Sequence, residues 1–120
     1  MATTALTTDN FVQTIQDNDI VLVDFWADWC GPCKMFAPVY DKASEANPEI
    51  TFAKVDTDAN QELAGGLGIS SIPTIMGFRD GVLVFNQPGA LNGAQLDQVI
   101  SAIKELDMDE VHAELAKQES

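Results

Sequence analysis

The sequence predicts an α/β fold, in which a central mixed β-sheet is flanked by helices on both faces. Two apolar stretches, at 20–26 and 50–56, enclose a segment with helical spacing, which indicates a parallel, right-handed βαβ unit. A hairpin signal at 79–81 between two further strand-like stretches adds antiparallel strands to the same sheet. With 120 residues, the chain fits one domain whose core needs no disulfide staples.

The first elements follow from residue type and spacing. After a short N-terminal strand, residues 9–18 carry a helical stripe of Phe11, Val12 and Ile15 behind possible threonine caps. Residues 20–26 are β-branched, aromatic and almost continuously apolar, which is typical of a strand covered on both faces.

Residues 30–46 predict a longer helix. Pro32 suits its first turn, whereas Pro38 lies inside the pattern and should kink the helix. The apolar positions at helical spacing are Met35, Phe36, Val39, Tyr40 and Ala43.

The next elements are shorter. Residues 50–56 alternate as a strand, and residues 57–67 predict a short helix interrupted by glycines. Residues 74–79 and 82–85 are the two strands of the hairpin.

Asn92 is expected to cap the last helix of the fold, with Gln95 in the reciprocal position of a capping box. We expect the domain to span residues 1–106. The acidic extension 107–120 is expected to be helical or partly flexible. The apolar face of the last helix consists of Leu96, Val99, Ile100, Ile103 and Leu106, and the extension adds a small stripe of Met108, Val111 and Leu115.

The charge of the chain excludes some functions. Acidic residues outnumber basic ones by 19 to 6, and the net charge is −13. Such a surface repels phosphate backbones and anionic lipids, so nucleic-acid and membrane binding are not expected. The N-terminus has neither a positive region nor a long apolar stretch, and we expect a soluble, cytoplasmic protein.

The chain has two cysteines, Cys30 and Cys33. A structural disulfide across two intervening residues closes almost no loop, and a structural zinc site needs four ligands. The single histidine, His112, lies in the extension and is expected to be solvated. Redox or nucleophilic chemistry therefore remains.

Cys30 stands where the strand at 20–26 has ended and the next helix begins. The free N–H groups and partial positive charge of a helix N-terminus favour a thiolate, the attacking species. Cys33 lies one helical turn further on, close enough for the two sulfur atoms to meet. Gly31 and Pro32 shape this turn, so the pair can alternate between dithiol and disulfide with little backbone movement.

At this point the sequence resembles the thioredoxin family over residues 6–106. The resemblance implies a thioredoxin fold and a general protein-disulfide reductase activity. The residues that carry it are Val23–Lys34, which include the segment Trp-Cys-Gly-Pro-Cys-Lys, then Ala53–Asp56, Gly68-Ile69, Ile72-Pro73-Thr74, Phe78, Gly81 and Gly89-Ala90.

The resemblance also implies roles for individual residues. Cys30 is the expected nucleophile that forms a mixed disulfide, and Cys33 the more buried thiol that resolves it. Asp24 matches the buried acid of the family, which accepts the proton of Cys33 through water, and Lys54 matches the neighbour of that acid. The alternatives are that Asp24 is a tolerated polar residue and Lys54 a solvated strand residue. Because burial of a carboxyl group is costly, however, such a group is more often functional, which favours a role for Asp24.

Pro73 matches the cis-proline that faces the cysteines, although a proline at a turn is ordinarily trans. Its cis bond would leave the backbone of Ile72 free to pair with an extended substrate. We expect Trp26 in the core and Trp29 on the surface. The expected substrate-binding residues are Trp29, Gly31, Pro32, Ile72, Pro73 and Gly89.

By the same resemblance, the chain needs no bound cofactor or metal, acts as a monomer, and receives electrons from a thioredoxin reductase that uses FAD and NADPH. Its other partners are disulfide-containing proteins. Gly-Pro between the cysteines resembles the reducing members of the family. Two alternatives are a docking subunit with incidental redox turnover and a metal-binding module.

The sequence departs from the common family pattern in three places. Gly77 stands in a strand where bulky aliphatic residues are usual, so a close approach or a small void is expected there. Pro88 removes an N–H group beside Gly89, which places peptide contacts there in doubt. The extension 107–120 is additional to the minimal fold.

Overall fold

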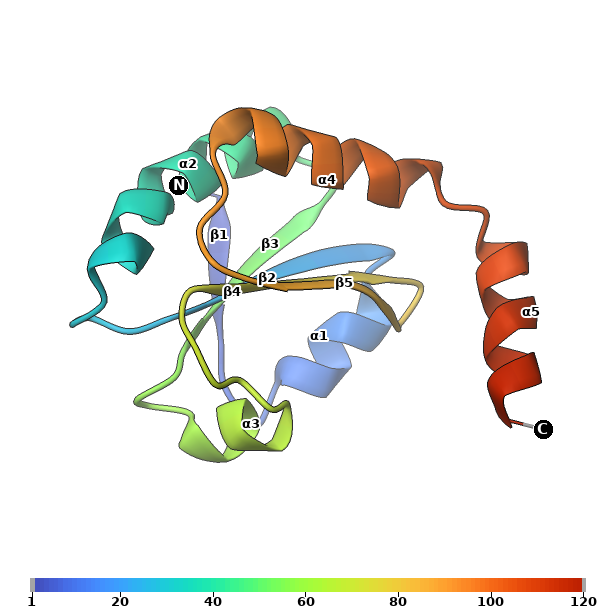
Figure 1. The fold of residues 1–120 in the computed structure, drawn as a ribbon, viewed down its shortest axis with the longest axis horizontal. Coiled ribbons are helices and arrows are strands. Elements are labelled where there is room, and N and C mark those ends of the chain that lie inside the picture. Colours follow the sequence, from blue (N-terminus) through green and yellow to red (C-terminus); the bar gives the residue numbers. More distant parts are fainter. Residues whose placement is uncertain (1, 120) are drawn as a thin grey trace.

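A five-stranded sheet with the strand order β1-β3-β2-β4-β5 forms the centre of the molecule (Figure 1). The computed structural model describes residues 2–119. Strands β1, β3 and β2 run parallel, β4 is antiparallel to β2, and β5 is antiparallel to β4. The strands are β1 (Thr3–Leu6), β2 (Ile20–Trp26), β3 (Thr51–Asp56), β4 (Thr74–Arg79) and β5 (Val82–Pro88). This order confirms the predicted α/β fold with its mixed sheet.

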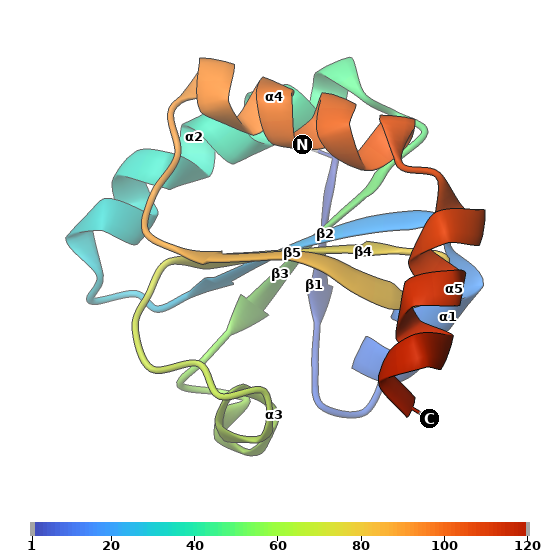
Figure 2. The same cartoon turned by 45° about the vertical axis from the view of Figure 1, so that its right-hand side comes forward.

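Helices lie on both faces of the sheet. Figures 1 and 2 show α2 and α4 on one face, and α1 and α3 on the other. Within residues 2–119, none of the helices combines the length and the apolar character needed to cross a bilayer. The helices are α1 (Phe11–Asp17), α2 (Gly31–Ala46), α3 (Gln61–Gly66), α4 (Gly93–Glu105) and α5 (Met108–Glu119).

The apolar run in β2 is explained by burial on both faces. Leu22 packs in the core beneath α2 and α4, whereas Val21, Val23 and Phe25 pack in the core on the side of α1. Because side chains alternate along a strand, Asp24 projects on the same side as Leu22, beneath α2. The fold thus buries one carboxyl group among apolar residues.

Three local predictions need correction. The threonine caps of α1 are wrong: the helix begins after Asn10, whose side chain makes no helix cap because its Oδ1 accepts from the Thr7 N–H at 2.8 Å. The short third helix is confined to α3, which includes Gly65 and Gly66 and ends before Gly68, a glycine with a φ angle of 73°. Strand β5 continues to Pro88 because it keeps pairing with β4.

Two other local signals, the hairpin turn and the capping box, are confirmed. Asp80 and Gly81 form the hairpin turn with φ angles of 52° and 81°, a conformation that favours glycine at the second position. Asn92 and Gln95 form a reciprocal capping box at the start of α4.

Gly77 lies at a close approach between β4 and α4. A Cβ atom on Gly77 would stand 2.7 Å from Ile103 Cδ1, 3.2 Å from Phe85 Cβ and 3.3 Å from Leu22 Cδ2. The missing side chain therefore leaves no void, because the tip of Ile103 occupies the space.

We expect Gly77→Val to lower the free energy of unfolding by about 1–3 kcal/mol, since overpacking a dense core forces its neighbours to move. In the Gly77→Val/Ile103→Ala double variant, the loss should be smaller than the sum of the two single losses by about 1 kcal/mol or more. Urea unfolding of the four proteins measures this coupling. Additive losses would show that the two residues do not compete for the same space.

Candidate redox site

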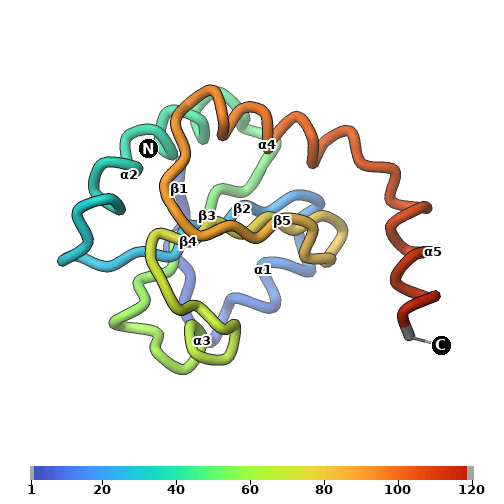
Figure 3. Tube along the Cα trace, in the orientation of Figure 1, coloured from blue at the N-terminus to red at the C-terminus, as the bar shows by residue number. Residues whose placement is uncertain are grey.

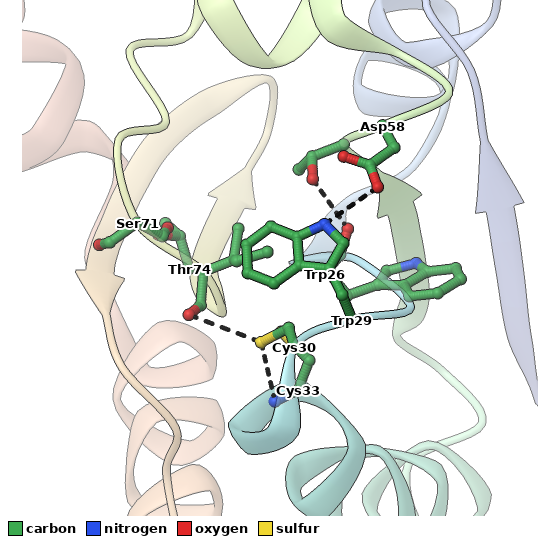
Figure 4. The surroundings of a disulfide bond; sticks show 9 residues. Trp26, Trp29, Cys30, Cys33, Asp58, Ser71 and Thr74 are labelled. Carbon is green, nitrogen blue, oxygen red and sulfur yellow. Dashed lines mark hydrogen bonds between the residues drawn. A yellow bond between two sulfur atoms is a disulfide. The ribbon is translucent and has the colours of Figure 1, made fainter.

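The two cysteines lie at the start of α2. They are joined by a disulfide bond, with their Cα atoms 5.3 Å apart (Figure 4). Cys30 is the N-cap residue of α2, and the backbone N–H of Cys33 donates to Cys30 Sγ at 3.2 Å. Pro32 occupies the first turn, where no hydrogen-bond donor is needed. A helix N-terminus is therefore directed at the sulfur of Cys30, which favours negative charge on it.

The expectation that Cys33 is the more buried cysteine is wrong for this oxidised form. Cys30 and Cys33 are each 3% exposed. Together with Ala27, they form a small apolar cluster against which Trp26 and Ile72 pack. What distinguishes the two sulfur atoms is the N–H bond to Cys30, because it stabilises that sulfur as a thiolate.

A shallow hollow lies beside the disulfide. It has a volume of about 260 Å³ and includes both Trp29 and Ile72 in its lining. The carbonyl oxygen of Ile72 is 3.7 Å from Cys30 Sγ, and the Ile72–Pro73 bond is cis, as the resemblance implied. An extended chain lying in this hollow would therefore meet a free stretch of backbone next to the disulfide.

Trp29 is held at the rim of this hollow. Its ring is 71% exposed, which agrees with the expected surface position, and its Nε1 donates to Asp58 Oδ2 at 3.1 Å. Asp58 is a site residue that the sequence reasoning missed. A signal for it existed, because Trp29 follows β2 and Asp58 follows β3, and the carboxyl ends of adjacent parallel strands meet at one edge of the sheet.

The remaining predicted contact residues differ in their exposure and in the hydrogen-bonding groups that they present to a substrate. Gly31 and Pro32 are exposed at the start of α2. The N–H of Gly89 donates to Pro73 O at 2.8 Å, and Pro88 has no N–H to donate. At this wall, neither Pro88 nor Gly89 therefore offers a free amide N–H to a substrate.

Asp24 lies in β2, on the side of the sheet that α2 covers. Its side chain has no exposed surface, and neither carboxyl oxygen has a hydrogen-bond partner among the described residues. Burial raises the pKa of Asp24 to about 7, against a lowering by the charge of Lys54 and a further rise from Asp41. The carboxyl group can therefore hold or release a proton near neutral pH.

Lys54 is opposite Asp24 in the parallel register of β2 and β3. It is partly buried, and its Nζ lies 5.3 Å from the ring centroid of Trp26. Trp26 is itself only partly buried, so its prediction as a core residue is wrong; its ring instead faces the ammonium group of Lys54 at the edge of the site. A cavity of about 130 Å³ is lined by Trp26, Lys54 and Cys33, among others.

Tyr40 is a second buried polar residue beneath the site that the sequence reasoning placed only in the core. Its hydroxyl donates to Ala53 O at 2.8 Å, and burial raises the pKa of Tyr40 well above its ordinary value. The hydroxyl therefore stays neutral and serves to anchor α2 on β3.

The described residues contain no group of three or more His, Cys, Asp or Glu side chains placed to hold a metal ion. The arrangement is thus a cysteine pair at a helix N-terminus, a buried carboxyl group and an adjoining hollow. Residues 2–105 match the family model described as thioredoxin.

The chain belongs to the thioredoxin family.

Known relatives agree with this assignment. The chain is 58% identical over 119 residues to a protein named putative thioredoxin 2 from Streptomyces coelicolor, covering 99% of this chain and 89% of that one. It is 46% identical over 104 residues to a thioredoxin from Alicyclobacillus acidocaldarius, covering 82% and 99%. A mutant thioredoxin from Halobacterium salinarum superposes with a TM-score of 0.80 at 36% identity, covering 87% and 92%.

Thioredoxin-family membership and the Cys30–Cys33 disulfide make this chain a thiol–disulfide oxidoreductase with a reductase role. The family uses the cysteine pair itself and needs no bound cofactor. The alignment with the Streptomyces protein covers 99% of this chain and so includes the extension, whereas that with the Alicyclobacillus protein covers 82% of this chain.

Proposed function

We propose that this thioredoxin-family chain reduces disulfides of many proteins, with Cys30 as the nucleophile and Cys33 as the resolving thiol. The observation that carries this assignment is the Cys33 N–H bond to Cys30 Sγ at the start of α2. This bond and the helix N-terminus stabilise the Cys30 thiolate in the reduced protein. The exposed Trp29 and the Ile72 backbone beside the sulfur then receive the substrate chain.

The reaction is a pair of thiol–disulfide exchanges. The Cys30 thiolate attacks one sulfur of the substrate disulfide, so that an intermolecular S–S bond forms and the first substrate thiolate leaves. The Cys33 thiolate then attacks Cys30 Sγ, the mixed disulfide breaks, and the second substrate thiolate leaves. Two electrons pass to the substrate, and the Cys30–Cys33 disulfide is formed.

Asp24 is proposed to accept the proton of Cys33 before the second exchange. Its pKa of about 7 suits proton transfer at neutral pH. The cavity lined by Cys33 and Lys54 is large enough for water, which can relay the proton towards the carboxyl group. Lys54 is proposed to keep the charged form of Asp24 accessible, because its positive charge lowers the pKa of that group.

The proposal also includes the domain boundary, the oligomeric state, the cellular location and the electron donor of the protein. Residues 1–106 are the catalytic domain and 107–120 an appended extension. The protein acts as a monomer in the cytoplasm, where thiols are kept reduced. Electrons arrive from a thioredoxin reductase that carries FAD and uses NADPH.

With NADPH and a bacterial flavoprotein thioredoxin reductase, we expect the oxidised protein to support continuous reduction of insulin disulfides. The reason is that the disulfide lies at the start of α2 and packs against Ile72, which lines the hollow beside Trp29. NADPH consumption at 340 nm measures the rate. Turnover with a ferredoxin-dependent reductase, and none with the NADPH enzyme, would contradict the proposed electron donor while leaving the cysteine chemistry intact.

A further inference from the structure

An apolar hollow lies between β5 and α4. It has a volume of about 370 Å³, and its lining includes Val84 and Phe85 from β5, Val99 and Ala102 from α4, and Leu106 beyond the end of that helix. Strand β5 is an edge of the sheet, so no neighbouring strand narrows this hollow. The first turn of α2, with its cysteines, and α5 lie at opposite ends of the molecule in both views (Figures 1 and 2).

A second hollow lies between β5 and α5, next to the first. Its volume is about 270 Å³, and Leu83, Val84, Leu106, Val111 and Leu115 contribute to its lining. Val84 and Leu106 line both hollows, which are therefore adjacent. We call the two together the β5 groove. Leu83 is 46% and Leu115 37% exposed, so apolar surface on both sides of the groove faces water.

The position of α5 is set by the corner that precedes it. Arg79 Nη1 donates to the carbonyl oxygens of Ile103, Lys104 and Leu106 at 2.8, 3.0 and 2.8 Å. Figure 3 shows the chain turning there from α4 into α5. Asp107 Oδ1 then accepts from the first backbone N–H groups of α5, at 3.0 and 3.2 Å. Because charge-assisted hydrogen bonds hold this corner, α5 has a fixed position beside β5 and forms one side of the groove.

The charges of the residues around the groove indicate which kind of partner can bind there. Among the described residues that line the two hollows there is no Lys or Arg, and Glu114 lines the side of α5. Glu114 also borders the hollow on the other flank of α5, together with Asp107, Glu110 and Lys117, and it forms an exposed ion pair with Lys117 at 3.9 Å. The extension carries 5 acidic residues and 1 basic residue. A second copy of the chain would bring its own net charge of −13 and be repelled.

We propose that the β5 groove binds a basic, amphipathic helical segment of a partner protein. The apolar face of that segment would cover Leu83, Val99 and Leu115, and its Lys or Arg side chains would reach Glu110 and Glu114. The apolar side chains that β5, α4 and α5 contribute to the two hollows would contact the apolar face of that segment, as in the recognition of an amphipathic helix by an apolar groove. This contact does not involve the cysteines, so it adds a partner-binding surface to the reductase.

The test uses the full-length oxidised protein and a synthetic peptide of about 18 Leu and Lys residues in an amphipathic pattern, long enough to form a helix. A matched peptide carries Glu in place of Lys. Calorimetric titration should show binding of the Lys peptide, and affinity for the Glu peptide should be at least about tenfold weaker. The Leu83→Ser/Leu115→Ser and Glu110→Gln/Glu114→Gln variants should each weaken binding of the Lys peptide about tenfold or more.

Two control variants match these changes on other surfaces. Val12→Ser removes an apolar side chain that is 61% exposed on α1, and Asp9→Asn/Glu62→Gln removes two exposed negative charges. Both should bind the Lys peptide within about twofold of the parent protein. All variants should keep insulin reduction within about twofold, which separates a failure of this proposal from a failure of the reductase assignment.

Three outcomes would overturn the proposal. The first is that the Lys peptide does not bind the parent protein. The second is that the charge controls weaken binding as much as Glu110→Gln/Glu114→Gln does, which would reveal only general attraction to an acidic protein. The third is that the parent protein sediments as a dimer that Leu83→Ser/Leu115→Ser dissociates, since a second copy would then occupy the groove.

Discussion

Replacing Cys30 with serine is expected to lower insulin-disulfide reduction by about 10³-fold or more, because a hydroxyl group cannot replace the thiolate as nucleophile. The helix N-terminus and the Cys33 N–H, which favour a charge on the Cys30 sulfur, would then face a neutral oxygen. Turbidity of insulin in the presence of dithiothreitol, with the uncatalysed rate subtracted, measures the loss.

The companion variant Cys33→Ser separates the two cysteines. Cys30 can still attack a disulfide, but no thiol is present to resolve the product, so a covalent adduct with the substrate should accumulate. Non-reducing gels and intact mass measure this adduct. Far-ultraviolet circular dichroism of both variants, compared with that of the reduced parent protein, controls for folding. Full activity in Cys30→Ser, or adduct formation by Cys30→Ser in place of Cys33→Ser, would reverse the proposed roles.

Replacing Asp24 with asparagine is expected to stabilise the protein at neutral and alkaline pH. The folded-state pKa of Asp24, about 7, lies above the ordinary value of 3.8, chiefly because the group is buried. The unfolded chain therefore releases this proton more easily, and native stability falls as pH rises from about 4 to about 7 and levels off above that range. A rise of this size corresponds to about 4 kcal/mol. Asparagine stays neutral and avoids this loss.

The measurement is the free energy of unfolding in urea at several pH values for the parent and Asp24→Asn. The difference between the two should be small below pH 4, grow between pH 4 and 7, and stay constant above. A pH-independent difference would show that the carboxyl group does not titrate in this range. Reduction of substrate should also slow by about tenfold or more in Asp24→Asn, since the proton acceptor of Cys33 is lost.

Lys54→Met provides a matched control for this prediction. Removing the positive charge takes away the one influence that lowers the pKa of Asp24, so that pKa should rise further. The pH range over which stability falls should then extend to higher pH than in the parent protein. An unchanged range would mean that Lys54 is too well solvated to act on Asp24, as a side chain partly screened by water can be.

Much of the secondary structure could be predicted from the sequence because it depends on interactions between residues that are close along the chain. The apolar run of β2, the turn at Asp80 and the capping box at Asn92 each depend on neighbours within a few residues, and each was predicted in its place. The caps of α1 were mispredicted because the helix begins after Asn10, whose side chain accepts from the Thr7 N–H instead of from a helix N–H. The sequence also left open whether Gly77 marks a void or a close approach, because this depends on how Ile103 packs against it.

By itself, the sequence determined the α/β class, the order of the elements and the cysteine pair at a helix start, because those properties depend on periodicity, capping and short spacing. Only the tertiary structure decided the relations between segments that are distant along the chain. It placed Asp58 against Trp29, brought Lys54 beside Asp24, and left both cysteines equally buried. It also set α5 beside β5 through the Arg79 corner. The reason is that the burial of a side chain, the pKa of its acid group and the shape of the surface around it depend on the helices and strands that pack against it in three dimensions.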